Sequence, residues 1–242
     1  MARACGNWQA AREFSDRGFV GSPREEPRLL VDRVLQEYEL GEFGQGAAYL
    51  ERLLKVTRLS PPGATVERVF LAGTILAAAR TTGVANFFEA AQEAVQTILS
   101  YPSATPLIAE GARISLALMA VHRGDAVAAE EECTGLLEFS GVSVVFGIST
   151  KHLLGLVAQT MGILDQASEH FEEALAFRSK AGYRPELAWT CCDYADTLLQ
   201  RDDECDRAKV MSLLDESLRI SSELGMRPLM ERVLSRREIL KV

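Results

Sequence analysis

The sequence predicts an all-α protein, built as an array of about six helical hairpins. Three observations predict this class. Aromatic residues make up only 7% of the chain while alanine, leucine and glutamate are abundant, a balance that favours packed helices over sheets. Glycines recur at intervals of 35 to 42 residues, and apolar segments with helical spacing flank them. Hydrophobic residues make up 48% of the 242 positions, which is enough for an ordered core.

The repeated turn is a glycine that is followed, in most blocks, by a small residue five positions later. The glycines are Gly6, Gly41, Gly83, Gly124 and Gly162, and the small residues are Ala11, Gly46, Ala129 and Ala167. The third block departs from this pattern, with Phe88 in that place and alanine only at Ala90 and Ala91. A glycine can end the first helix because it accepts the left-handed conformation, and a small residue one turn later lets two helix axes approach closely. Polar residues that favour the start of the second helix are Asn7, Glu42 and Asp125.

A sixth unit follows with a different turn. We expect helices over 185–200 and 208–224, joined by the charged segment "RDDECDR", with Leu214 and Ser217 as core positions of the second helix. Cys205 stands roughly where the glycine would be, so a longer turn is expected. Gly225 ends this unit, and Pro228 opens a last helix over 228–242. We expect that helix to be a solvated cap, with polarity from Glu231, Arg232, Arg236, Arg237, Glu238 and Lys241.

These blocks resemble tetratricopeptide repeats, the helix-turn-helix units that stack into an α–α superhelix. The fifth block carries the family's signature spacings most completely, at Leu154, Gly155, Gly162, Ala167, Phe171 and Ala174. The resemblance covers essentially the whole chain and implies a TPR-like solenoid over 1–242.

A narrower resemblance concerns the C-terminal third. Segments such as "HFEEALAFRSKAGYRPELAW" are similar to the C-terminal repeat regions of bacterial regulators that join an ATPase module to a nucleotide cyclase or to a LuxR-type DNA-binding domain, including MalT-like regulators. This resemblance implies a bacterial signalling context. It also implies that any ATPase or cyclase activity would reside in domains that this sequence lacks.

Only "MARAC" precedes Gly6, where a first helix of a dozen or more residues is expected. We therefore expect a fragment of a larger protein, with an unpaired capping helix as the alternative. A truncated first repeat would expose an apolar helix face, so self-association through the N-terminal repeat is a further expectation.

Charge and composition bear on location and partners. The net charge of −8 argues against binding of a phosphate backbone as the main role. No apolar run approaches the roughly 20 residues that span a membrane, and the N-terminus lacks the apolar run of a signal peptide, so a cytoplasmic location without membrane contact is expected. Five irregularly spaced cysteines indicate reduced thiols. In "TCCDY", small buried core residues are favoured over a reactive site.

The sequence offers little for catalysis. It contains no GxxxxGK[ST], GxGxxG, HExxH or GxSxG motif. His122, His152 and His170 are far apart, and the acidic runs "AEEEC" and "RDDECD" are typical of solvated surface, so neither a metal nor a cofactor is expected. We expect a protein that is not an enzyme.

Function is expected to lie on the concave surface formed by the first helix of each hairpin. By analogy with the family, the residues facing that groove and contacting a protein or peptide partner are Tyr38, Arg80, His122, His152, Gln159, Thr190 and Tyr194. Two functions follow: a scaffold that holds a partner protein or a neighbouring domain of its own parent chain, or a sensor that binds a small effector. A deep groove with clustered polar groups would favour the sensor, and a shallow apolar strip would favour the scaffold.

Overall fold

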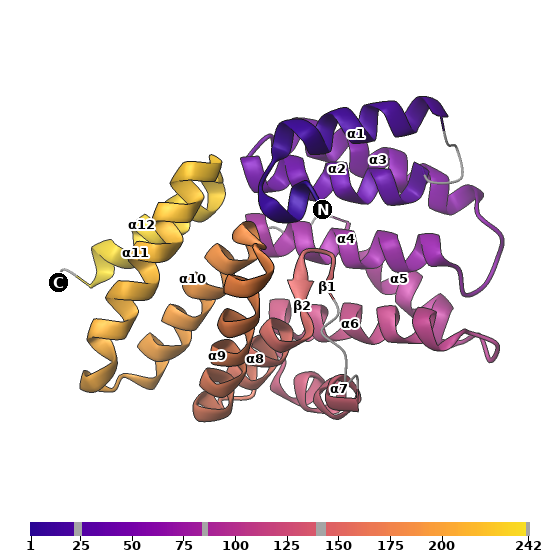
Figure 1. Cartoon of the computed structure of the whole chain (residues 1–242). Coiled ribbons are helices and arrows are strands. Elements are labelled where there is room, and N and C mark those ends of the chain that lie inside the picture. Colours follow the sequence, from indigo (N-terminus) through magenta and orange to yellow (C-terminus); the bar gives the residue numbers. More distant parts are fainter. Residues whose placement is uncertain (22–25, 84–86, 139–143, 241–242) are drawn as a thin grey trace.

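Helices make up nearly the whole of the computed structural model, which describes residues 1–21, 26–83, 87–138 and 144–240 (Figure 1). The predicted all-α class is confirmed. A short antiparallel hairpin, β1 (Val144–Val145) and β2 (Ile148–Ser149), precedes α8. In chain order the helices are α1 (Trp8–Gly21), α2 (Glu26–Leu40), α3 (Phe43–Leu59), α4 (Val66–Thr82), α5 (Phe88–Leu99), α6 (Pro106–Arg123), α7 (Ala126–Glu138), α8 (Thr150–Thr160), α9 (Leu164–Ala181), α10 (Arg184–Arg201), α11 (Arg207–Leu224) and α12 (Arg227–Ile239), with one-turn helices η1 (Arg3–Cys5) and η3 (Glu204–Asp206).

The predicted turn glycines adopt the left-handed conformation. Their φ angles are 79° at Gly6, 76° at Gly41, 70° at Gly83, 65° at Gly124 and 78° at Gly162. Two of the three residues predicted to start the second helix are confirmed. The side-chain oxygen of Asn7 accepts from the backbone N–H of Ala10, and that of Asp125 accepts from the backbone N–H of Ala128, at 3.1 Å each. Glu42 makes no such bond with α3, since its carboxylate pairs with Arg227 of α12.

The small residue of each repeat is the fourth residue of its helix. Ala11, Ala129 and Ala167 occupy that position in α1, α7 and α9 and are buried, and Gly46 occupies it in α3, against the ring of Tyr38. In the third block α5 begins later, at Phe88, so Ala91 takes the fourth position and is fully buried. The departure seen in the sequence is therefore a longer turn followed by the same packing.

The sixth unit also has a longer turn, as predicted. However, the left-handed residue that ends α10 is Asp202, with φ 55°, rather than Cys205. The chain then makes the single turn η3, where the Asp203 carboxylate accepts from the Cys205 N–H at 2.9 Å. Leu214 and Ser217 are buried in α11, as expected.

The helices form two layers. Each even-numbered helix from α2 to α8 packs against the next even-numbered helix, so α2, α4, α6, α8 and α10 form a continuous inner layer. The odd-numbered helices pack against the outside of this layer (Figure 1). Close inner contacts depend on small residues, because a Cβ at Gly111 of α6 would overlap the side chain of Val69 on α4.

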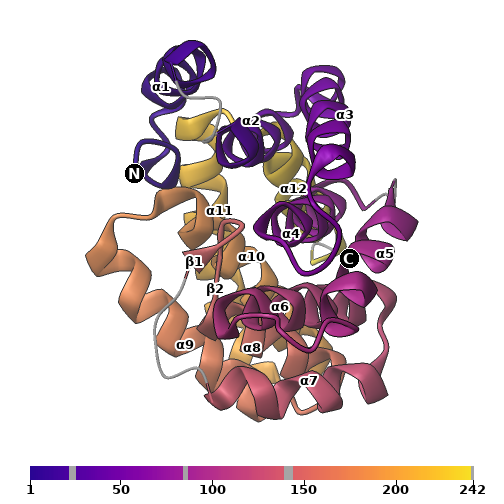
Figure 2. The same ribbon diagram turned by 90° about the vertical axis from the view of Figure 1, so that its right-hand side faces the viewer.

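The C-terminal helices lie against the N-terminal part of the array. Helix α12 packs against α2 and α4, and η1 packs against α10 (Figure 2). The Trp8 indole donates to the backbone carbonyl of Leu224 at 2.7 Å, and Arg227 lies 2.8 Å from the carboxylate of Glu42. The array thus curls until its last helix lies against its inner layer.

The last helix differs from the expected solvated cap. Leu229 and Val233 are fully buried, and Arg232 and Arg236 turn inward to carboxylates of α10. Such inward packing was not predicted because the contacts join segments far apart in the sequence. Lys241 lies outside the described residues.

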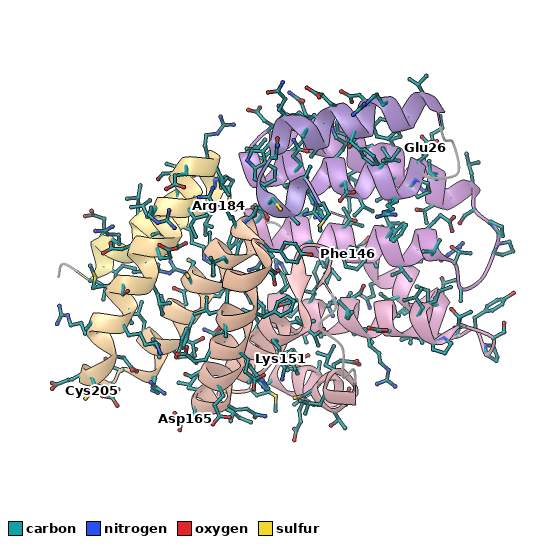
Figure 3. The ribbon with its side chains drawn as sticks, viewed as in Figure 1. Glu26, Phe146, Lys151, Asp165, Arg184 and Cys205 are labelled. Carbon is teal, nitrogen blue, oxygen red and sulfur yellow. The ribbon has the colours of Figure 1, made fainter. Side chains whose placement is uncertain are left out.

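The β1–β2 turn inserts one aromatic ring into the inner layer. Phe146, labelled in Figure 3, is buried and packs on Gly73 in the middle of α4, where a Cβ would overlap the ring. Phe146 itself has a positive φ of 55°, which is uncommon for an aromatic residue. The glycine is therefore required by the ring that covers it.

We predict that Gly73→Ala lowers the free energy of unfolding by about 1–3 kcal/mol, because the new methyl group displaces the Phe146 ring. Gly44→Ala is the matched control, since a Cβ at Gly44 of α3 meets nothing within 4 Å. Urea unfolding measures both, and Phe146→Ala should remove most of the Gly73→Ala cost in a double-mutant cycle. An equal cost of Gly73→Ala with and without Phe146 would contradict this packing.

Candidate functional site

Two of the residues predicted to face the groove, Arg80 and His152, contact one carboxylate that was not among the predicted site residues, and a third, Thr190, contacts His152. Arg80 of α4, His152 of α8 and Thr190 of α10 lie together around Asp193 of α10, and Arg232 of α12 completes the set. We call these five residues the Asp193 network. They come from four helices, three of the inner layer and the C-terminal one.

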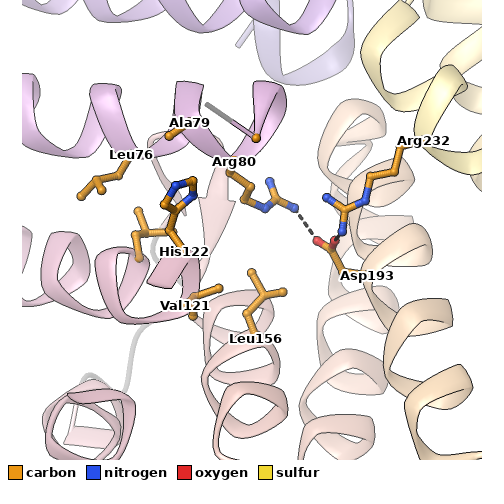
Figure 4. A pocket seen from close by; sticks show the side chains of 10 residues that line it. Leu76, Ala79, Arg80, Val121, His122, Leu156, Asp193 and Arg232 are labelled. Carbon is orange, nitrogen blue, oxygen red and sulfur yellow. Dashed lines mark hydrogen bonds and ion pairs between the residues drawn. The ribbon is translucent and has the colours of Figure 1, made fainter. Parts of the chain in front are cut away.

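Asp193 accepts from three side chains. The distances to its oxygens are 2.5 Å from Arg80 Nη2, 2.8 Å from His152 Nε2 and 3.0 Å from Arg232 Nη2. Figure 4 shows the two guanidinium groups reaching the same carboxylate from α4 and from α12. Asp193 is only 1% exposed, so these contacts replace its contacts with water.

The charges around Asp193 fix its ionisation. Burial by itself raises the pKa of this carboxyl group, yet the attraction of Arg80 and Arg232 and the hydrogen bond from His152 hold the pKa well below its ordinary value. In the same way, although burial lowers it, the pKa of Arg232 is raised by its nearby carboxylates. Asp193 is therefore a buried anion that holds two partly buried cations.

The histidine tautomer follows from its partners. Because a carboxylate only accepts, His152 Nε2 carries the proton that it donates to Asp193. The 3.2 Å approach of Arg80 Nη2 to His152 Nε2 is then a contact between two donors that share one acceptor. Nδ1 lies 3.0 Å from the hydroxyl of Thr190. Thr190, His152 and Asp193 have the order of a nucleophile, base and carboxylate. Each is at most 1% exposed, so in this closed form they are a buried chain of contacts with a structural role.

Two more groups extend the network outward. Trp189 lies beneath both cations, with its ring centroid 4.7 Å from Cζ of Arg80 and 5.6 Å from Cζ of Arg232. Its indole N–H donates to Glu39 of α2 at 2.8 Å. Burial raises the pKa of Glu39, against a smaller lowering by that hydrogen bond. The network therefore connects α2, α4, α8, α10 and α12.

A second carboxylate of α10 also holds α12. Asp196 of α10 accepts from Arg232 at 3.0 Å and from Arg236 at 2.7 Å. Because Asp193 and Asp196 are three residues apart, both lie on the face of α10 that meets α12. This face positions the arginines of α12 one turn apart.

A cavity of about 160 Å³ adjoins the network (Figure 4). Its polar side includes Arg80, Asp193 and Arg232, together with His122 of α6. Its apolar side is formed by Leu76, Ala79, Leu118, Val121 and Leu156. The cavity therefore brings together cations and an apolar wall, which is the composition of a site for a small amphipathic molecule.

The remaining predicted groove residues lie apart from the network. His122 is half-buried, with its ring 5.4 Å from that of Phe88. Tyr38 packs on α3, against Gly46, and Tyr194 stacks on Phe171 of α9, so both tyrosines face the outer layer. Gln159 pairs with Gln200 at 3.4 Å near the surface. The tyrosines differ from expectation because each fills the space above a small or aromatic residue of its partner helix.

The sequence around Asp193 contains a signal for part of the network. A carboxylate inside the apolar run "AWTCCDYA" is costly to bury unless it has partners, and that cost could have singled out Asp193. Arg232 carried no such signal, because a polar terminal helix looks solvated in sequence.

The cysteines and histidines have structural surroundings. Cys191 and Cys192 are buried, and burial raises the pKa of each thiol to about 12, which confirms the prediction of core residues in "TCCDY". His170 of α9 is buried, and burial lowers its pKa. Within the described ranges, no group of three or more His, Cys, Asp and Glu side chains is arranged to hold a metal ion. In the same parts of the chain, no helix is long and apolar enough to cross a membrane.

No protein-family model matches this chain, and no curated protein matches it. The likeness to tetratricopeptide repeats therefore stays a prediction from the turn glycines and the small residues that follow them.

We predict that Asp193→Asn lowers the free energy of unfolding by about 3 kcal/mol, because it removes the shared anion of the partly buried Arg80 and Arg232 and leaves Arg232 with Asp196 alone. The control is Asp165→Asn. Asp165 pairs with Arg201 at 3.0 Å but is 90% exposed, so its loss should cost less than about 1 kcal/mol. Urea unfolding at pH 7 measures both, and equal costs would contradict the role of Asp193.

Proposed function

We propose that this chain is a non-enzymatic, TPR-like scaffold that mediates interactions between proteins, or between parts of one parent protein, in bacterial signalling. The observation that carries the proposal is the seating of α12. Asp193 of the inner layer, which also contacts the predicted residues Arg80 and His152, holds an arginine of the chain's own last helix. In this proposal, α12 occupies the partner site, and the partner is likewise a helix with an inward-facing arginine.

The anchoring of α12 suits a replaceable occupant. Its fully buried apolar side chains are Leu229 and Val233, and its other inward contacts are the ion pairs of Arg232 and Arg236. Buried ion pairs give specificity of position more than net stability, because desolvation offsets much of their attraction. A partner helix with similar side chains could therefore compete with α12, and its apparent affinity would be reduced by the fraction of closed protein.

A second function, a sensor for a small effector, is favoured by the cavity beside the Asp193 network. The cavity lies where α12 meets the inner layer, so an effector bound there would bias the position of α12. Self-association through the first repeat also stays a proposal, supported by the exposed Phe14 and Val20 on α1.

Replacement of α12 by a peptide of the same sequence tests the proposed scaffold function. A fluorescent peptide of residues 226–240 should bind the full chain carrying Arg232→Ala at least about tenfold more tightly than the wild-type chain, because loss of a buried pair weakens the resident helix. Fluorescence anisotropy measures both affinities.

Two controls accompany the peptide experiment. Arg237→Ala removes a surface pair with Asp215, whose side chain is 59% exposed, and should leave peptide affinity near that of the wild type. A peptide with alanine in place of Arg232 should bind weakly to every chain. If this altered peptide binds as well as the native one, the proposed recognition of an arginine-bearing helix is wrong.

A further inference from the structure

The polar side of the cavity has an excess of positive charge. The residues that line it include two cations, Arg80 and Arg232, and one carboxylate, Asp193. Two further carboxyl groups, Glu186 at 3.8 Å from Nδ1 of His152 and Glu39 at 2.8 Å from the Trp189 indole nitrogen, do not line the cavity. A partly buried site with one more cation than anions favours an anionic ligand.

The guanidinium groups have further N–H donors that such a ligand can use. Within the part of the chain that the structure describes, the hydrogen bonds of Arg80 and of Arg232 all involve Nη2, and the buried Nε of Arg232 lacks a partner. The side chains of Arg80 and Arg232 are 17% and 30% exposed. Figure 4 shows both reaching Asp193 at the edge of the cavity that they line. Guanidinium groups bind carboxylates well because their planar N–H groups match the two oxygens.

The opposite side and the size of the cavity restrict the rest of the ligand. Leu118, Val121 and Leu156 form an apolar wall that would exclude a fully polar molecule. The volume of about 160 Å³ is close to that of an engineered apolar cavity, about 150 Å³, that holds benzene. The carboxylate of Asp193 lies among the cations and would repel a second negative charge on the ligand. The ligand is thus small, partly apolar and singly charged.

We propose that the cavity between α4, α6, α8, α10 and α12 binds a small monocarboxylate, whose anionic group pairs with Arg80 and Arg232 and whose apolar body packs against Leu118, Val121 and Leu156. This inference deepens the second function, the sensor for a small effector, and rests on it. Because α12 supplies Arg232, the bound carboxylate joins α12 to α4, and binding stabilises the closed form.

Sodium benzoate is the probe, with benzamide as its neutral counterpart and sodium phosphate as a more highly charged anion, all at constant ionic strength. At about ten times its dissociation constant, benzoate should raise the melting temperature of the full chain by roughly 3–5 °C. Benzamide and phosphate should each raise it by less than about 1 °C. In the wild-type protein, transferred NOEs should join the benzoate ring protons to methyl groups of Leu118 and Val121.

Two variants locate the site. Val121→Phe fills the apolar side while keeping every charge, and Arg80→Gln removes one cation; each should weaken benzoate binding at least about tenfold. Arg219→Gln, on an exposed pair with Glu216, is the control and should bind as the wild type does. Equal effects of benzoate and benzamide, or NOEs to other methyl groups, would overturn the proposal even if both variants fail to fold. Failure of benzoate with success of the peptide exchange would leave the scaffold function standing and reject only this site.

Discussion

The closed form of this protein depends on the carboxylate of Asp193, held between a cation from α4 and a cation from α12. Arg80 belongs to the N-terminal half of the inner layer and Arg232 to the last helix, so one buried anion joins segments about 150 residues apart in sequence. His152 of α8 contacts that anion, and Thr190 of α10 holds the other ring nitrogen of His152. Without this centre, α12 would keep the apolar side chains of Leu229 and Val233 and the pair of Arg236 with Asp196.

Stability and recognition are distributed differently in this chain. The hairpins are held by apolar packing, with alanine or glycine at the fourth position of most outer helices and the rings of Tyr38 or Phe171 against neighbouring backbone. The contact between the last helix and the inner layer adds the ion pairs of Arg232 and Arg236 to the burial of Leu229 and Val233. The apolar hairpins can therefore remain folded while the ionic contact is exchanged, as the proposed scaffold function requires.

Local rules predicted the hairpins well, and long-range contacts account for what they missed. Turn glycines such as Gly124 follow from backbone conformation, which depends on neighbouring residues only. The first residue of α5 could not be predicted, because the turn before it is longer than in the other blocks. The start of the helix decides which residue takes its fourth, closely packed position. The apolar run around Asp193 indicates a buried carboxylate, but its pairing with Arg232 cannot be predicted locally, because that pairing exists only once the array has curled. The contact of Phe146 with Gly73 was missed for the same reason.

Hydrogen–deuterium exchange of the unmodified chain, read by mass spectrometry, tests the closure most directly. If α12 is seated on the inner layer, its backbone amides will exchange at least about 100-fold more slowly than those of an unstructured peptide, with protection like that of α4 and α10. If α12 exchanges within seconds while α4 and α10 remain protected, the last helix is not held by the Asp193 network, and closure of the array by its own C-terminal helix is contradicted.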